Sequence, residues 1–259
     1  KLNPKAKNKV DFNSDIGESF GQYKLGRDEE IIQSISSANI ACGFHAGDPN
    51  WMKKTVRIAE QHKVGIGAHP SYPDLRGFGR RDITIDPEEV QNDVIYQIGA
   101  LTAFTSNNKL QHVKPHGAMY NKAVNDEKLA EAICNAILEV DSELILLALS
   151  GSKWIHIAKE MGLRVAQEVF ADRAINSDGT LVSRSIDGSV IHDANIIAQR
   201  TLKMVQEGYI TSITGDEVPI EADSICMHGD TPGSVQIAKK VKTVLESSGI
   251  NIVPLSELI

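Results

Sequence analysis

Residues 38–69 read ANIACGFHAGDPNWMKKTVRIAEQHKVGIGAH, and this stretch has the pattern of a strand, a helix and a second strand. The apolar run Ala38–Phe44 predicts a buried strand, and Val64–Ala68 predicts another. An aspartate–proline pair starts the helix predicted over Pro49–Lys63, because aspartate caps a helix and proline fits its first turn. A strand–helix–strand unit of this kind favours two parallel strands in one sheet.

The same alternation runs along the whole chain. Strand patterns occur at Val10–Ile16, Ala38–Phe44, Val64–Ala68, His112–Pro115, Leu144–Leu149, Arg164–Phe170 and Ser224–Met227. Amphipathic helical patterns occur at Pro49–Lys63, Glu88–Phe104, Glu127–Leu138, Ala194–Val205 and Val235–Leu245, with further capped starts at Asp86-Pro87 and Thr231-Pro232. A small hairpin is predicted around Thr214–Asp216. The sequence predicts an α/β fold, a TIM-like (β/α)7 barrel that is closed or nearly closed and forms a single domain over residues 10–259.

The composition is that of an ordinary globular protein and leaves a small-molecule site open. The chain has 259 residues, of which 41% are hydrophobic and 24% charged, and this excludes disordered and coiled-coil classes. Residues 1–9 hold four lysines and no acid, which predicts a flexible basic N-terminal segment, and the rest of the chain carries a net charge of −11. A body this acidic, without a basic stripe, is not expected to bind nucleic acid or an anionic membrane.

Cysteine usage and hydropathy predict a cytoplasmic protein. Cys42, Cys134 and Cys226 are widely spaced in apolar contexts, which is typical of reduced core residues. No run approaches the roughly 18 apolar residues of a membrane helix. Residues 1–10 also lack the apolar centre of a signal peptide.

Polar side chains follow nearly every predicted strand at its C-terminal end. Because parallel strands of a barrel direct these ends to one mouth, we expect the side chains to meet in one pocket. They are Asn13, Asp15 and Glu18 after the first strand, His45 and Asp48 after the second, His69 after the third, Lys114 and His116 at the fourth, Glu168, Asp172 and Arg173 at the sixth, and His228 and Asp230 after the seventh.

The histidines in this set allow two kinds of chemistry. Carboxylate and imidazole groups together suit Zn²⁺ and other first-row ions, and the candidate metal ligands are Asp15, His45 and His69. Their spacing is not a compact metal motif such as HExxH. Without a metal, the same groups serve as general acids and bases. The residues alone leave both interpretations open.

The cationic side chains indicate an anion site. Lys114 lies inside a predicted strand, where a charged group is stable only beside a carboxylate or a ligand anion. The segment around Arg80 and Arg81 is predicted to be a surface loop, or a lid whose guanidinium groups pair with a carboxylate or phosphate. Arg173 and Arg184, from the long loop after the sixth strand, suit the same role. No Walker-type GxxxxGK[ST] sequence and no GxSxG nucleophile elbow are present.

Long motifs in chain order make the sequence resemble the LamB/YcsF family. They are Asp11–Glu18, Ser37–Asp48, Gly67–Asp74, Gly77–Arg81, His112–Ala118, Glu168–Arg173 and Cys226–Asp230. The resemblance runs from about Val10 to the C-terminus, and Met119 and Met227 are conservative departures from the family pattern. It implies a seven-stranded barrel like that of the glycoside hydrolase/deacetylase group.

The same resemblance implies an activity. Members of the family act as the A component of 5-oxoprolinase, which opens 5-oxo-L-proline to L-glutamate with ATP as co-substrate and with two partner subunits, B and C. Opening a stable five-membered lactam requires an activated carbonyl and stabilisation of a tetrahedral oxyanion. How the steps divide among the subunits, and whether a divalent metal takes part, is left open by the motifs.

Hypothetical roles follow for the polar residues at the mouth. Asp15 orients or deprotonates water, and Lys114 stabilises the oxyanion or a phosphoryl group. His45, His69 or His228 protonates the leaving nitrogen. Arg80 or Arg173 holds a substrate carboxylate or phosphate. The expected catalytic residues are Asp15, His45, His69, Lys114, His116, Glu168 and His228, and the expected substrate- or phosphate-binding residues are Asn13, Arg80, Arg81, Asp172 and Arg173.

Two other functions stay open at the level of sequence. The polar mouth also suits a metal-dependent deacetylase that acts alone on an N-acylated sugar. A non-catalytic regulatory component of the complex is the second alternative, and it predicts that substitutions at the mouth leave turnover of an assembled complex unchanged. A homo-oligomer is likewise compatible with the sequence.

Overall fold

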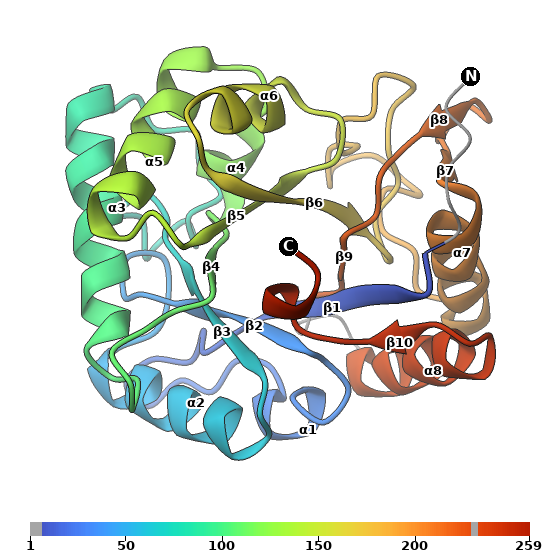
Figure 1. Cartoon of the computed structure of the whole chain (residues 1–259), viewed down its shortest axis with the longest axis horizontal. Helices are drawn as coiled ribbons and strands as arrows, with labels where there is room; N and C mark the ends of the chain where they lie inside the picture. The colour runs from blue at the N-terminus through green and yellow to red at the C-terminus, as the bar shows by residue number, and fades with distance from the viewer. Residues whose placement is uncertain (1–6, 229–232) are drawn as a thin grey trace.

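Parallel strands form a closed barrel of seven in the computed structural model, which describes residues 7–228 and 233–259 (Figure 1). In chain order they are β1 (Lys9–Ile16), β2 (Ser37–Ala41), β3 (Gly65–His69), β4 (His112–Val113), β5 (Ile145–Leu149), β6 (Arg164–Phe170) and β9 (Ser224–Cys226). Each strand pairs with the next, and β9 pairs with both β6 and β1, which closes the barrel. The predicted α/β barrel is therefore confirmed, with small differences at the strand ends.

Helices surround the barrel and bury apolar side chains against it (Figure 1). They are α1 (Asp28–Ile31), α2 (Pro49–Gln61), α3 (Pro87–Thr102), α4 (Gly117–Ala123), α5 (Glu127–Val140), α6 (Lys153–Glu160), α7 (Ala194–Glu207) and α8 (Ser234–Ser247). The side chains of Asp48 and Asp86 accept hydrogen bonds from the first-turn amides of α2 and α3, as the aspartate–proline pairs predicted. The predicted start at Thr231-Pro232, like the candidate Asp230, lies outside the described residues.

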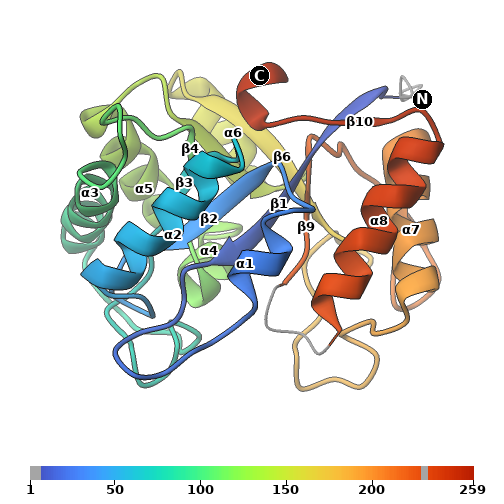
Figure 2. The same ribbon diagram turned by 90° about the horizontal axis from the view of Figure 1, so that it is seen from below.

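The C-terminal segment closes the barrel at the end where the strands begin. Strand β10 (Asn251–Ile252) pairs in parallel with the N-terminal end of β1, and the short helix η1 (Leu255–Glu257) lies across the barrel end (Figure 1). Leu255 is buried against β5 and β6. Figure 2 shows η1 at one end of the barrel and the loops that follow β1 (blue) and β6 (gold) at the other. The barrel is thus accessible from its C-terminal mouth.

Two smaller features concern the predicted hairpin and the N-terminal segment. Strands β7 (Tyr209–Thr211) and β8 (Glu217–Pro219) pair antiparallel around the predicted turn, so the hairpin is confirmed. Lys9 already belongs to β1, and Lys7 forms an ion pair with Asp223. The described part of the segment predicted to be flexible is therefore held against the barrel, and residues 1–6 lie outside the described residues.

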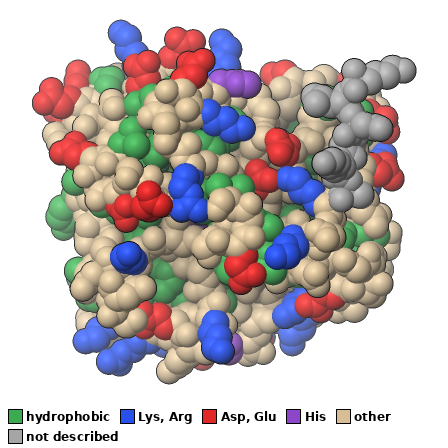
Figure 3. Space-filling model, in the orientation of Figure 1, with side chains coloured by type: hydrophobic (Ala, Val, Ile, Leu, Met, Phe, Trp, Pro, Cys, Tyr) green, Lys and Arg blue, Asp and Glu red, His purple; other side chains and the backbone are tan. Residues whose placement is uncertain are grey.

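Burial of the cysteines agrees with the sequence prediction. Cys42, Cys134 and Cys226 are all buried and free. Cys42 and Cys134 act as small core side chains, whereas Cys226 Sγ lies 3.1 Å from Lys114 Nζ. Among the described residues, no helix combines the length and the apolar character needed to cross a membrane. On the face shown in Figure 3, basic and acidic side chains are interspersed rather than gathered into one broad patch.

Candidate active site

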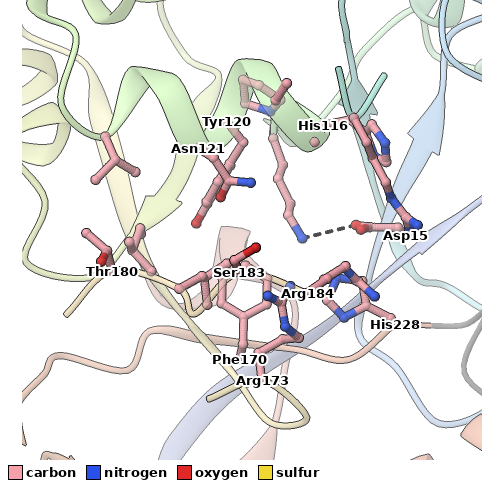
Figure 4. Close-up of a pocket in the computed structure, with 18 of the residues that line it drawn as sticks. Asp15, His116, Tyr120, Asn121, Phe170, Arg173, Thr180, Ser183, Arg184 and His228 are labelled. Atoms are coloured by element: carbon pink, nitrogen blue, oxygen red, sulfur yellow. Dashed lines mark hydrogen bonds and ion pairs between the residues drawn. The ribbon is translucent and has the colours of Figure 1, made fainter. Parts of the chain in front are cut away.

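A cavity of about 600 Å³ opens at the C-terminal mouth of the barrel. The ends of β1, β3, β4 and β6 supply its floor, and the loop after β6 and helix α4 form its sides. In Figure 4, Asp15, His116, Tyr120, Arg184 and His228 lie around one common space. Nine of the residues singled out in the sequence line it, namely Asp15, Glu18, His69, Arg80, Lys114, His116, Arg173, Arg184 and His228.

Lys114 occupies the centre of the cavity floor. Its ammonium nitrogen is 3.0 Å from Asp15 Oδ1 and 3.0 Å from Glu168 Oε2, and only 3% of the side chain is exposed. Burial alone would lower the pKa of Lys114, but the charges of Asp15 and Glu168 hold that pKa well above its usual value. Two buried carboxylates therefore keep one buried ammonium group charged at the place where the cavity begins.

A network of amides holds the two carboxylates in place from below. Asn13 donates through Nδ2 to Glu168 Oε2 at 2.9 Å, and Asn39 donates through Nδ2 to Asp15 Oδ1 at 2.9 Å. His112 donates through Nε2 to Asn39 Oδ1 at 2.7 Å and is itself fully buried. The polar interior of the barrel thus fixes the carboxylates before any ligand arrives, which favours a preorganised site.

Sequence reasoning missed Asn39, although a register signal was present. Asn39 is the direct neighbour of Asp15 in the pairing of β1 with β2, and of Gly67 in the pairing of β2 with β3. A Cβ atom at Gly67 would lie 2.2 Å from the His112 ring, so a glycine is needed for that ring to reach across. Strand pairing, which the sequence does not state, is what makes Asn39 part of the site.

Tyr120 is a second lining residue that the sequence did not single out. It lies on α4, is 3% exposed, and packs edge-on against Phe170. Burial, followed by the nearby charge of Glu168, raises the pKa of the Tyr120 phenol well above its usual value, so the group stays protonated. In the sequence, Tyr120 has the same apolar neighbours as a tyrosine of the core, so the sequence alone does not reveal that it lines the cavity.

Three histidines and one glutamate form a buried cluster at one side of the cavity. His116 Nδ1 is 3.0 Å from His69 Nε2, and His45 Nε2 is 3.1 Å from Glu18 Oε1. The rings of His45 and His116 stack with their centroids 3.7 Å apart. Burial lowers the pKa values of His45 and His116 well below the usual range, so both rings are neutral.

The loop after β3 fits tightly around this cluster. Gly79 has φ of +63°, and a Cβ atom there would lie 2.2 Å from Ser71 Oγ and 2.8 Å from His45 Cβ. Phe78 holds the unusual positive φ of +55°, and its carbonyl oxygen accepts a hydrogen bond from His116 Nε2 at 2.8 Å. The loop thus combines backbone strain with a direct contact to a site residue, which is typical of functional loops.

The two arginines of this loop point in different directions. Arg80 lines the cavity and places its guanidinium 4.9 Å from the centre of the Phe78 ring. Arg81 forms an ion pair with the buried Asp74, its side chain is 61% exposed, and it does not line the cavity. Of the predicted pair, the structure brings Arg80 to the site and leaves Arg81 outside it.

Arg173 is the most unusual charged group in the cavity wall. The residue is 6% exposed, and its guanidinium donates to the backbone carbonyls of Ser189 and Val182. Within residues 7–228 and 233–259, no acidic side chain lies within ion-pair distance of it. Burial, followed by the positive charge of Arg184, lowers the pKa of Arg173 to about 10. A buried guanidinium without a carboxylate partner favours an anionic ligand.

His228 lies opposite the histidine cluster and is held by Asp172. Its Nδ1 atom is 3.1 Å from both carboxylate oxygens of Asp172. Burial would lower the pKa of His228, but the Asp172 carboxylate outweighs it and raises that pKa above its usual value. Asp172 therefore holds His228 in position and does not itself line the cavity.

Two groups of side chains are close enough to hold a metal ion. The first consists of Glu18, His45, His69 and His116, and the second of Asp15, Cys226 and His228. The second group fits a metal poorly, because Lys114 already neutralises Asp15 and burial keeps the Cys226 thiol protonated by raising its pKa. The structure thus divides the sequence candidates Asp15, His45 and His69 between the two groups.

Comparison with known proteins assigns the chain to a family. The family model described as LamB/YcsF matches residues 10–259. The chain belongs to the LamB/YcsF family. A relative from Thermococcus onnurineus, named as the A component of 5-oxoprolinase, is 56% identical over 97% of this chain and 99% of its own length. The resemblance found in the motifs is therefore confirmed over the whole barrel.

Solved structures support the family assignment and the fold. The lactam utilization protein from Thermus thermophilus matches with a TM-score of 0.90 and 46% identity, covering 95% of this chain and 99% of that one. A peptidoglycan N-acetylglucosamine deacetylase matches with a TM-score of 0.54 and 12% identity, covering 99% of this chain and 90% of that one. The deacetylase shares the barrel fold alone, and this confirms the predicted deacetylase-like architecture for the LamB/YcsF barrel.

Proposed function

We propose that this chain is the A component of a 5-oxoprolinase and opens the lactam ring of 5-oxo-L-proline to give L-glutamate. It acts with partner subunits B and C, and ATP is the co-substrate of the assembly. Full-length relatives that carry this name support the proposal, as does the match to a lactam utilization protein. The single observation that carries it is the cavity floor, where a buried ammonium group and a carboxylate lie beside a buried guanidinium that has no carboxylate partner among the described residues.

The cavity chemistry suits a small anionic lactam. The carboxylate of 5-oxo-L-proline fits Arg173, whose guanidinium donates to backbone carbonyls. Arg80 and Arg184 add positive charge at the same cavity wall. The guanidinium groups of Arg173 and Arg184 together exceed the single charge of 5-oxo-L-proline, so they also suit a phosphoryl group that ATP places on the lactam oxygen with help from the partner subunits.

The ring opening itself follows from three groups. Asp15 accepts a proton from a water molecule, whose oxygen then bonds to the lactam carbonyl carbon. The ammonium group of Lys114 faces the resulting tetrahedral centre and stabilises negative charge on its oxygen or on a phosphoryl group attached to it. The ring carbon–nitrogen bond breaks, and the nitrogen takes a proton from His228, whose pKa the Asp172 carboxylate raises. Where the lactam oxygen carries a phosphoryl group, the ring-opened product is an acyl phosphate, and a second water molecule releases inorganic phosphate from it to leave L-glutamate.

The remaining predicted residues position these groups. Glu168 pairs with the ammonium group of Lys114, and Asn13 donates a hydrogen bond to Glu168. His69 Nε2 lies 3.4 Å from Asp15 Oδ2. His45 and His116 pack behind and beside His69. We assign Arg81 no contact with substrate, because its guanidinium pairs with Asp74. Neither alternative function is favoured by the relatives.

Substitution of Arg173 tests this proposal in the three-component complex. We expect Arg173→Gln to raise the KM for 5-oxo-L-proline by about 10- to 100-fold, because a hydrogen bond to a charged group contributes about 1.5–3 kcal/mol. Steady-state glutamate formation at saturating ATP measures the change. Arg57→Gln is the matched control, since Arg57 is exposed and does not line the cavity.

The two parts of the proposal fail in different ways. An unchanged KM in the Arg173→Gln complex would remove Arg173 from substrate binding but leave the activity in place. A wild-type complex that forms no glutamate from 5-oxo-L-proline and ATP would overturn the activity itself.

A further inference from the structure

Three donor atoms converge on one part of the cavity wall. His116 Nδ1 lies 3.0 Å from His69 Nε2 and 3.7 Å from Glu18 Oε1, and all three atoms lie within 4.8 Å of one another. Each of the three residues lines the cavity. They come from the loop after β1, the end of β3 and the residue that precedes α4, so separate elements bring them together.

The hydrogen bonds on the far side of each ring fix what faces inward. His69 Nδ1 lies 2.6 Å from the carbonyl oxygen of Lys114, and His116 Nε2 lies 2.8 Å from that of Phe78. A carbonyl only accepts, so both of these nitrogens carry the ring proton. His69 Nε2 and His116 Nδ1 are then the ring nitrogens that face each other, at 3.0 Å, and each can offer a lone pair to a cation. Two lone pairs at this distance require a positive species beside them.

We propose that His69, His116 and Glu18 bind a divalent first-row transition metal ion of the Zn²⁺ class, with a further coordination position facing the cavity. Tetrahedral bonds of about 2.0–2.1 Å separate neighbouring ligand atoms by roughly 3.3 Å. The separations of 3.0 and 3.7 Å lie on either side of that value. Two imidazoles with one carboxylate and an open position are a common donor set for catalytic zinc.

His45 completes the arrangement as a positioning residue. It does not line the cavity, and its Nε2 atom contacts Glu18 Oε1 at 3.1 Å from behind. Groups that hold metal ligands in this way orient them, and backbone carbonyls behind histidine ligands do the same. An ion here would supply a Lewis acid beside Asp15 and Lys114.

Metal binding by the purified chain tests the proposal, with Co²⁺ as a spectroscopic probe and Zn²⁺ as its competitor. After chelator treatment, we expect one Co²⁺ per chain, with visible absorption of a low-coordinate site, displaced by Zn²⁺. His116→Gln and Glu18→Gln should each weaken binding by more than about 100-fold, and His45→Gln by about 10- to 100-fold. The exposed His62 provides the control, His62→Gln, which should bind as the wild type does.

Each possible result of the binding experiment supports or contradicts the proposed metal site. Circular dichroism of the metal-free variants shows whether they fold, and the graded loss among folded variants distinguishes ligands from a positioning residue. A cobalt–thiolate charge-transfer band would assign the ion to Cys226 and overturn the proposal. Absence of stoichiometric Co²⁺ or Zn²⁺ binding would also overturn it and leave a shared proton between the two rings. The proposal shares its cavity with the proposed lactam activity, but binding is measured without turnover, so either can fail alone.

Discussion

Lys114→Met is expected to remove both stability and activity. The side chain is 3% exposed and lies 3.0 Å from each of two carboxylates, Asp15 and Glu168. Breaking a buried ion pair by removing one partner costs about 3–5 kcal/mol, because the remaining charge is uncompensated. Loss of the group that stabilises the oxyanion should lower kcat of the three-component complex by about 10²- to 10³-fold. Denaturant unfolding of the chain and glutamate formation by the complex measure the two effects.

A matched control separates this effect from the loss of any lysine. Lys203 is 38% exposed and pairs with Glu217 at 3.2 Å, so Lys203→Met should change the free energy of unfolding by at most about 1 kcal/mol. The double variant Lys114→Met, Asp15→Asn should be less destabilised than the sum of the single changes, because one unpaired charge is removed. A Lys114→Met chain as stable as the wild type would contradict the assigned buried ion pair.

Asp15→Asn is expected to have the second large effect, and on activity rather than stability. Burial would raise the pKa of Asp15, but His69 and Lys114 hold that pKa well below its usual value, so the group is a carboxylate at neutral pH. Asparagine keeps the size and one oxygen acceptor but cannot take a proton from water. We expect kcat of the complex to fall by about 10²- to 10⁴-fold, the range for a general base.

The stability of this variant gives an internal check. Lys114 keeps its contact with Glu168 when Asp15 is neutral, so no charge is left without a partner. Asp187→Asn, at an exposed position of the loop after β6, is the matched control and should leave kcat unchanged. Normal turnover by a well-folded Asp15→Asn complex would remove Asp15 from the reaction.

Much of the barrel could be predicted because its elements carry strong local signals. The run Arg164–Phe170 is a strand with the predicted limits, and the aspartate–proline pairs at Asp48 and Asp86 start helices where predicted. Strand β10 was missed because Asn251–Ile252 is too short to show alternation. Pairing, more than local propensity, makes those two residues a strand.

The site was predictable where one residue type contradicts its surroundings. Lys114 stands out because a lysine in an apolar strand needs a charged partner. Asn39 does not stand out, because its role depends on its register with Asp15. Arg80 and Arg81 look equivalent in sequence, yet a loop turn sends one into the cavity and the other to Asp74. Side-chain direction in loops depends on backbone angles that residue types alone do not fix.

Lactam ring opening by this chain can be measured in a reconstituted complex. The B and C partners are supplied with 5-oxo-L-proline and ATP, with and without this chain, and glutamate is followed at equal ATP. We expect glutamate only when the wild-type chain is present, and the Asp187→Asn chain should restore its formation equally well. Equal glutamate formation by the two partners alone would contradict the proposed function.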